Sequence, residues 1–552
     1  MTQKFPRLFL ILLATLFVLN LVQSYFTELI YDEAYYWYYA QNLDWGYFDH
    51  PPMVAFLIEI SSWFFNGELG VRFMSCVLSV GTYMILWLLI DNPKKKDYVL
   101  HFFLLMFSMT LMNAYGFLTL PDTPLLFFTA LFLLLYKRFL ENPTLWVSVF
   151  MGMVMAALMY SKYHAVLVIL FVLLSNIKIV RDWKAWLAVV IALICYTPHF
   201  LWLYQHDFVS IKYHLYERPN QAYSFTKFTL GYFVNLIAIF GLLFYWVYLS
   251  LYKAKASDKF SKALLFLTYG FLLFFFVSSF NRRVQTQWII IVSIPMAIIA
   301  FNHLLENAKS RKWMYRMGIA SLIILLYARA WLVYQPLLPK LYETHGNKEW
   351  VASLNSKAGD IPIVFENSYR RAPMYEFYSG NPAFSLNNHM YRKNQYSIDG
   401  SEERVRGEKV LYSSKYRNAG DISYKHPDST IFYGAFMEGF QSYRKLQCIV
   451  EKTEDAFQYN LKVYNPYGFD IPLEQLKYTI AYSNKYKQVK ELKSLRVQAI
   501  QLNQLMLKSR DTAFFNFQLP IPKMENPGYF RVGISEHDLL PGLNGKPIKI
   551  NE

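Results

Sequence analysis

Residues 31–53, YDEAYYWYYAQNLDWGYFDHPPM, combine side chains that can do acid–base chemistry with a dense set of aromatic rings and no lysine or arginine. The acids and the histidine of this stretch are Asp32, Glu33, Asp44, Asp49 and His50. A carboxylate held close to a hydroxyl group can take the proton that the hydroxyl must lose to become a nucleophile. The stretch therefore indicates an acid-lined site that activates an acceptor hydroxyl.

Further polar clusters follow later in the chain, each beside or between apolar runs. They are LPDTPL around Asp122, YSKYH around Lys162 and Tyr163, HDFVSIKYHLYERP beginning at His206, and NRRVQTQW around Arg282 and Arg283. Lysine and arginine hold phosphate groups and stabilise the negative charge that develops as such a group leaves. Carboxylates in one segment and cations in others suit transfer of a group from a lipid phosphate to a hydroxyl acceptor.

The composition indicates that these segments lie in an integral membrane protein. The 552 residues are 55% hydrophobic and only 17% charged, whereas soluble domains carry about a quarter charged residues. Because a membrane-spanning helix needs about 20 apolar residues, the runs predict roughly eleven spans, the fourth to sixth being short. We expect them at about 8–26, 70–90, 98–117, 123–137, 145–160, 164–178, 185–204, 228–252, 262–280, 287–305 and 314–334. The first is expected to be a retained helix, since no small-residue cleavage site follows it.

The charges of the connecting loops predict the orientation. One side receives eighteen basic residues: Lys4, Arg7, Lys94, Lys95, Lys96, Lys137, Arg138, Lys178, Arg181, Lys184, Lys253, Lys255, Lys259, Lys262, Lys309, Arg311, Lys312 and Arg316. The other side receives seven: Arg72, Lys162, Lys212, Arg218, Lys227, Arg282 and Arg283. Cytoplasmic loops carry the excess of positive charge, so all the polar clusters described above and the C-terminal tail are expected outside. This distribution also accounts for the net charge of +16 without a nucleic-acid partner.

The remainder of the chain reads as ordinary soluble protein. Strand-like runs such as DIPIVFE alternate with helix-compatible segments, which predicts an α/β domain over residues 336–445 after a membrane domain over residues 1–335. From residue 446 the alternating pattern favours a β-sandwich-like domain to residue 552. No glycine-rich phosphate loop follows a strand, so nucleotide binding is not expected. The three cysteines are far apart, which makes a disulfide framework unlikely.

The motifs also resemble a known family. YDEAYYWYYAQNLDWGYFDHPPM closely resembles the first outer loop of the superfamily C glycosyltransferases, with the nearest likeness to lipid A aminoarabinose transferases and protein O-mannosyltransferases. The resemblance continues in order through LTLPDTPLLFF, YSKYHAVL, TPHFLWLYQHDFVSIKYH and RRVQTQW, and thus covers residues 1 to about 335. It implies a mainly α-helical polytopic membrane protein of the bacterial inner membrane, with its active site and its tail facing the periplasm.

The resemblance implies inverting transfer of a single sugar from a polyprenyl-phosphate donor to a lipid, glycan or protein hydroxyl. It indicates Asp32 as the acceptor-side catalytic carboxylate, Glu33 as its support and Asp122 as a second functional acid. Lys162, Arg282 and Arg283 are expected to hold the donor phosphate, while Asp49, His50, Tyr163 and His206 complete the substrate-binding mouth. The Trp-Trp-Asp motif of oligosaccharyltransferases is absent, which disfavours transfer of a whole glycan to asparagine.

Other interpretations of these residues stay open. Asp32 and Glu33 also suit a solvated helix N-terminus, Asp122 before Thr123-Pro124 resembles an N-cap, and Lys162 can extend to a membrane interface. A divalent metal is possible, but no tight ligand spacing assigns one. A lipid-linked glycan transporter or flippase is the rival function, although transporters more often bury their ionisable residues near the midplane. A non-enzymatic scaffold that presents the tail would leave the outer motifs unexplained.

Overall fold

The computed structural model describes residues 5–217, 221–455, 458–500 and 504–550. Lys4 and Arg218, which the loop-charge argument used, lie outside the described residues. The chain divides into two compact units. The first consists of Met1–Lys212 and Tyr223–His345, and the second of Tyr213–Ala222 and Gly346–Glu552.

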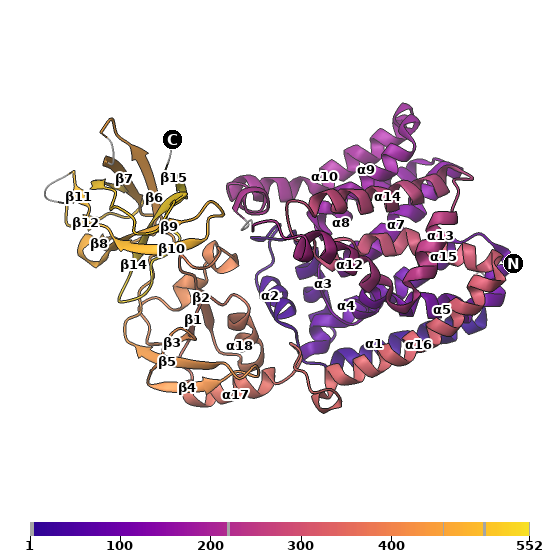
Figure 1. Cartoon of the computed structure of the whole chain (residues 1–552), viewed down its shortest axis with the longest axis horizontal. Coiled ribbons are helices and arrows are strands. Elements are labelled where there is room, and N and C mark those ends of the chain that lie inside the picture. Colours follow the sequence, from indigo (N-terminus) through magenta and orange to yellow (C-terminus); the bar gives the residue numbers. More distant parts are fainter. Residues whose placement is uncertain (1–4, 218–220, 456–457, 501–503, 551–552) are drawn as a thin grey trace. The chain divides into compact units, whose positions relative to one another are not determined.

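The first unit is helical (Figure 1). Among the described residues, seven helices are long and apolar enough to cross a membrane: α1 (Arg7–Phe26), α4 (Gly67–Leu89), α7 (Asp122–Glu141), α10 (Trp183–Gln205), the run Thr226–Lys253, α14 (Lys259–Ser278) and α16 (Ala308–Val333). Shorter apolar helices accompany them: α3 (Met53–Ser62), α5 (Val99–Ser108), α6 (Thr110–Ala114), α8 (Leu145–Ser161), α9 (Val166–Ser175) and α15 (Ser293–Glu306). The helical polytopic fold is therefore confirmed, and about eleven spans fit it.

Two of the predicted spans are interrupted. The span expected at 98–117 breaks between α5 and α6, and the one at 228–252 breaks at Gly241 between α12 (Gly231–Phe240) and α13 (Phe244–Lys253). Gly241 has a φ of 52°, which residues with a side chain rarely adopt. A Cβ there would lie 3.1 Å from the Thr110 hydroxyl, so the two breaks lie against each other. Runs of apolar residues predicted continuous helices here, because the hydrophobicity of a segment does not show where its backbone turns.

The polar clusters from distant parts of the sequence meet at one end of the helical unit. Arg72, near the start of α4, contacts backbone carbonyls at the end of α1. Asp122 at the start of α7 pairs with the residue that follows α8, and the segment before α3 contacts the end of α10. These helix ends therefore bring Asp122 and Lys162 together and hold the segment before α3 against α10.

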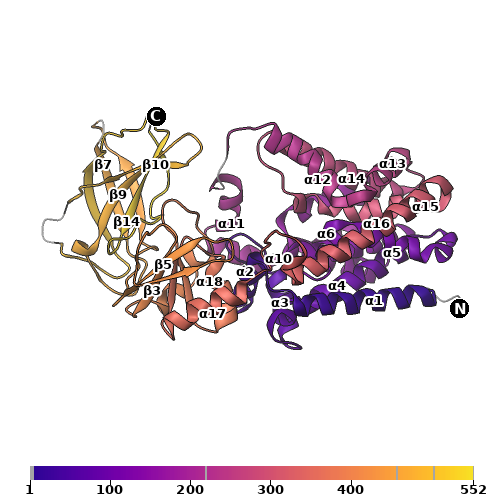
Figure 2. The same cartoon turned by 60° about the horizontal axis from the view of Figure 1, so that its bottom comes forward.

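The second unit begins with an α/β part, seen at the lower left of Figure 1 and again in Figure 2. Its five-stranded sheet has the order β2-β1-β3-β5-β4, in which β1 is parallel to both β2 and β3. The strands are β1 (Ile363–Glu366), β2 (Ala383–Leu386), β3 (Val410–Ser414), β4 (Ile422–Lys425) and β5 (Ile431–Met437). Helices α17 (Asn347–Ala358) and α18 (Arg371–Ser379) pack against each other beside this sheet.

Among the described residues, two four-stranded sheets follow, with the orders β10-β9-β14-β15 and β11-β13-β7-β6. Their strands are β6 (Gln447–Lys452), β7 (Gln458–Tyr464), β9 (Lys477–Ser483), β10 (Val489–Ser494), β11 (Gln498–Ala499), β13 (Thr512–Gln518), β14 (Tyr529–Ser535) and β15 (Ile548–Lys549). A short pair, β8 (Ile471–Pro472) and β12 (Met506–Leu507), accompanies them. Alternate residues of β7 and β14 are buried in one hydrophobic core that both sheets share, among them Leu461, Val463, Phe530 and Val532. The sheet-rich C-terminal region is thus confirmed, and its shared core is that of a β-sandwich.

Candidate active site

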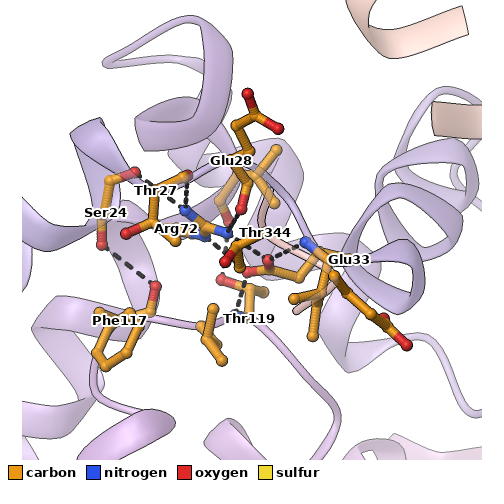
Figure 3. Close-up of polar contacts among 12 residues, drawn as sticks. Ser24, Thr27, Glu28, Glu33, Arg72, Phe117, Thr119 and Thr344 are labelled. Atoms are coloured by element: carbon orange, nitrogen blue, oxygen red, sulfur yellow. Dashed lines mark hydrogen bonds and ion pairs between the residues drawn. The ribbon is translucent and has the colours of Figure 1, made fainter. Parts of the chain in front are cut away.

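A buried ion pair fixes the start of α2 (Tyr31–Ala40). The Arg72 side chain donates from Nε to Glu33 Oε1 at 2.7 Å and from Nη2 to Glu33 Oε2 at 2.5 Å, and both side chains are fully buried. Arg72 also donates to the backbone carbonyls of Ser24, Thr27 and Glu28 at 3.1, 2.5 and 3.0 Å (Figure 3). The guanidinium therefore ties the end of α1 to the first turn of α2.

Backbone amides complete the environment of Glu33. The amide of Thr119 donates to Oε1 at 2.8 Å, and the amide of Ile30 donates to Oε2 at 3.2 Å. A buried carboxylate is stable only when its charge is paired and its oxygens accept hydrogen bonds, and Glu33 meets both conditions. Glu33 thus holds the first turn of α2 against Arg72 and the backbone at Thr119. The neighbouring Asp32, on the same turn, is half-buried.

A second ion pair joins Asp122 to Lys162. Lys162 Nζ donates to both carboxylate oxygens of Asp122, at 2.7 and 2.9 Å, and both residues are buried. Lys162 follows α8 in an extended conformation, and Asp122 is the first residue of α7. Because an ammonium group has three N–H donors, this pair leaves one donor of Lys162 for a further acceptor.

Tyr115 connects this pair with the first acidic stretch. Its phenol interacts electrostatically with both Asp122 and Asp32. Tyr115 is itself buried and follows α6. Asp32 and Asp122, which lie ninety residues apart in the sequence, therefore both interact electrostatically with one phenol. Tyr115 was not among the residues predicted from the sequence.

Asp49 is bound from the side of α2. The hydroxyl of Tyr39 donates to Asp49 Oδ1 at 2.6 Å, and Asp49 is buried. Burial raises the pKa of the Tyr39 phenol and the negative charge of Asp49 raises it further, so the phenol keeps its proton. The ring of the following residue, His50, lies 5.5 Å from that of Tyr36 in an edge-to-face arrangement.

Tyr163 and His199 form a hydrogen-bonded chain next to this acid. The Trp45 carbonyl can only accept, so His199 Nδ1 donates to it, at 2.6 Å. A neutral His199 then accepts at Nε2 from the hydroxyl of Tyr163, at 3.2 Å. Tyr163 also interacts electrostatically with Asp49. The chain links the predicted substrate-binding residues Asp49 and Tyr163 to α10.

Trp202 fixes the loop between α2 and α3 to the same helix. Its indole N–H donates to Asp44 Oδ2 at 2.7 Å, and the ring of His206 stacks on it with a centroid separation of 4.2 Å. The hydroxyl of Ser210 donates to the Tyr47 carbonyl at 2.8 Å. His199 and Trp202 were missed from the sequence because they lie within an apolar run. Their spacing of three residues, which places both on one helix face, was the available signal.

The absence of a side chain at Gly46 lets the Trp202 ring pack against the loop between α2 and α3, and we predict that Gly46→Ala disturbs this packing. A Cβ at Gly46 would lie 2.4 Å from the Trp202 ring, so the ring or the loop must move. We expect a loss of about 1–3 kcal/mol in the stability of the helical unit, as for other overpacked sites. Thermal unfolding in detergent measures it. Gly231→Ala is the matched control, because a Cβ there meets only the Thr226 carbonyl at 3.7 Å. Equal stability of both variants would contradict the prediction.

Arg282 and Arg283 lie in a turn after α14, and both are exposed. Within the described part of the chain, neither guanidinium forms an ion pair with a carboxylate. The structure therefore does not join them to the acidic pairs, although the turn is anchored nearby by an Asn235 side-chain N–H that donates to the Val284 carbonyl at 2.9 Å. Among the described residues, no group of three or more histidine, cysteine, aspartate or glutamate side chains could hold a metal ion.

Comparison with known proteins shows what this chain is similar to. Residues 49–202 match the family model of dolichyl-phosphate-mannose-protein mannosyltransferases. The fold is similar to that of ArnT from Cupriavidus metallidurans in the apo state, with a TM-score of 0.53 at 14% identity, covering 73% of this chain and 92% of ArnT. The same values hold for ArnT bound to undecaprenyl phosphate. The chain thus has a fold similar to that of ArnT, and the resemblance seen in its sequence is confirmed.

One relative is similar over a long stretch of sequence. It is the lipid A galacturonosyltransferase RgtD of Rhizobium johnstonii, which is 24% identical to this chain over 294 residues. The alignment covers 50% of this chain and 60% of the relative. The chain therefore matches somewhat less than two thirds of the length of this curated relative.

Proposed function

We propose that the protein is an inner-membrane glycosyltransferase that moves a single sugar from a polyprenyl phosphate to an acceptor hydroxyl outside the cytoplasm. The observation that carries this proposal is the 2.8 Å hydrogen bond from the Thr119 amide to Glu33, which places the Asp32–Glu33 turn beside the start of α7 and its buried Asp122–Lys162 pair. An acid for the acceptor and a cation for the donor are the two groups that such a transfer needs. The relative that acts on lipid A and the ArnT complex with undecaprenyl phosphate support the substrate classes.

In this proposal Asp32 is the general base. It takes the proton of the acceptor hydroxyl, and the oxygen attacks the anomeric carbon from the face opposite the phosphate. The bond between that carbon and the phosphate oxygen breaks, so the configuration inverts and polyprenyl phosphate leaves with the bonding electrons. Glu33 is a positioning residue, because its pair with Arg72 holds the first turn of α2 in place.

The phosphate of the donor is assigned to Lys162, Arg282 and Arg283. The Asp122 carboxylate orients the Lys162 ammonium so that its remaining N–H can donate to a phosphate oxygen. The two arginines would add charge from the turn after α14 when the donor is bound. Asp49, His50, Tyr163 and His206 would contact the sugar or the acceptor, with the aromatic rings of α2 around them.

We predict that Arg282→Ala combined with Arg283→Ala weakens donor binding about tenfold or more, because each charge-assisted hydrogen bond contributes roughly 1.5–3 kcal/mol. Both side chains are exposed, so the fold should be unaffected. Binding of a polyprenyl phosphate to the purified protein measures this. Lys255→Ala with Lys259→Ala removes the same charge from the loop before α14 and from the first residue of that helix, and serves as control. Unchanged donor affinity in the arginine variant would refute the assignment.

Mass spectrometry of surface lipids, glycans and proteins from cells with and without the gene tests the proposed activity. We expect one of these fractions to lose the mass of a single sugar when the gene is removed. This result also identifies the acceptor. Identical fractions from both strains, under conditions in which the protein is produced, would count against the proposal.

A further inference from the structure

The helical unit contains a buried arginine that has no carboxylate partner among the described residues. Arg329 lies on α16, four residues before this helix ends at Val333, and only 4% of it is exposed. Within the described part of the chain it forms no ion pair. A charge inside a membrane-spanning helix is costly unless an opposite charge lies close to it. The transfer chemistry proposed above does not use Arg329, so its charge has to be balanced in another way.

Two asparagines hold the Arg329 side chain in one orientation. Its Nε donates to Asn113 Oδ1 at 2.9 Å, and its Nη2 donates to Asn20 Oδ1 at 2.9 Å and to the Asn113 carbonyl at 3.1 Å. Asn113 belongs to α6 and Asn20 to α1, which packs beside α16 (Figure 1), and both asparagines are buried. These neutral oxygens fix the guanidinium group but carry no negative charge.

Two nitrogens of this cluster have no acceptor among the described residues. Arg329 Nη1 and Asn20 Nδ2 are buried, and neither forms a hydrogen bond there. Because Arg329 Nη2 donates to Asn20 Oδ1, these two nitrogens belong to adjoining planar groups. A buried donor without an acceptor is destabilising, so both groups favour a ligand that accepts hydrogen bonds. An anion accepts them and also balances the charge of Arg329.

The surroundings of the two nitrogens limit the size of such a ligand. A Cβ at Gly116 would lie 2.8 Å from Asn20 Nδ2, so the backbone approaches the amide closely. The ring centroids of Phe117 and Phe107 lie 4.4 and 5.4 Å from the guanidinium carbon of Arg329. The rings attract the cation but do not supply a full negative charge. Close packing of this kind favours an anion of a single atom over the phosphate or carboxylate of an organic molecule.

We propose that Arg329 and Asn20 form a binding site for a small inorganic anion of the size of chloride, in the core of the helical unit. Arg329 Nη1 and Asn20 Nδ2 donate to the ion, and the ion supplies the negative charge for the guanidinium. A water molecule accepts the same hydrogen bonds but leaves this charge unbalanced. The site joins α1 to α16 and is separate from the transfer chemistry proposed above.

Thermal unfolding of the full chain in detergent tests the proposal, with chloride as the probe and gluconate as an anion too large for the site. Protein purified without halide is titrated with sodium chloride, while sodium gluconate keeps the ionic strength constant. A ligand that binds only the folded state stabilises it, so the unfolding midpoint should rise by roughly 2 °C for each tenfold increase of chloride above its dissociation constant. The same midpoint at every ratio of the two anions overturns the proposal.

The Asn20→Asp variant locates the site. It places a carboxylate where Asn20 Oδ1 now accepts from Arg329 at 2.9 Å, so the guanidinium gains a permanent counter-charge. We expect this variant to fold without halide and its unfolding midpoint to be independent of chloride. A chloride response as large as that of the wild type contradicts the proposal.

Arg329→Gln should also lose the response to chloride, because it removes the charge that the ion balances. The matched control is Arg316→Gln, which makes the same change at an exposed position of α16 and should respond as the wild type does. If Arg329→Gln does not fold, the result with Asn20→Asp decides. Since these measurements require no sugar transfer, failure of this proposal and failure of the proposed activity are separate results.

Discussion

The Asp32→Asn variant is expected to lose sugar transfer by about 10²–10⁴-fold, the range that a general base contributes. The amide has the size of the carboxylate and cannot take the proton of the acceptor hydroxyl. Asp32 is half-buried, whereas its neighbour Glu33 carries the buried ion pair, so the substitution should leave the start of α2 in place. Transfer rates and thermal unfolding of the same purified sample measure the two effects separately.

Glu59→Gln is the matched control for this experiment. It removes a carboxylate from the same acid-rich region, on α3, and its amide oxygen can still accept the 3.1 Å hydrogen bond from the Trp63 indole. We expect transfer by this variant to stay close to that of the wild type. Full activity in Asp32→Asn would exclude Asp32 as the general base, and another acid, such as Asp122, would then have to take the proton of the acceptor.

The Arg72→Met variant is expected to lose about 3–5 kcal/mol of stability, because it leaves the Glu33 carboxylate buried without its counter-charge. It also removes the donor for three backbone carbonyls at the end of α1. Thermal or denaturant unfolding in detergent measures the loss. Arg282→Met is the control, since it makes the same change at an exposed position.

A double variant separates the ion pair from the packing of the arginine. Arg72→Met combined with Glu33→Gln should be more stable than Arg72→Met alone, because the uncompensated buried charge is gone. The coupling between the two sites should be of the order of 1–3 kcal/mol. Additive losses would show that the two side chains act independently, in conflict with the geometry of the pair.

Much of the helical architecture could be predicted from the sequence, since long apolar runs in a membrane protein have few alternatives to a helix. Long helices such as α4 and α10 lie close to their predicted ranges. The helix breaks at Gly241 and between α5 and α6 could not be predicted from the sequence, because they depend on contacts between two segments more than a hundred residues apart. In the tail, β1 lies within the predicted strand-like run DIPIVFE, whereas no helix was predicted over the residues of α18.

The sequence shows which residues of the site are unusual, but it does not show which of them contact each other. The unusual residue types around Asp32, Asp122 and Lys162 stand out in an apolar chain, but their partners do not. The loop-charge argument treats Arg72 only as one of the few basic residues on the outer side of the membrane. Nothing in its local sequence indicates that it binds Glu33, 39 positions earlier. Asp122 and Lys162 were expected to act separately, and only their spatial contact makes them one unit. The predicted roles of these residues stay predictions until the variants are measured.

Reconstitution tests the central claim most directly. The purified full chain in lipid nanodiscs is mixed with a membrane extract that contains polyprenyl-phosphate sugars and with an extract of surface lipids and glycans. Mass spectrometry should then find an acceptor that has gained one sugar residue and an equal amount of free polyprenyl phosphate. An acceptor of unchanged mass, with every donor lipid still carrying its sugar, would contradict the account.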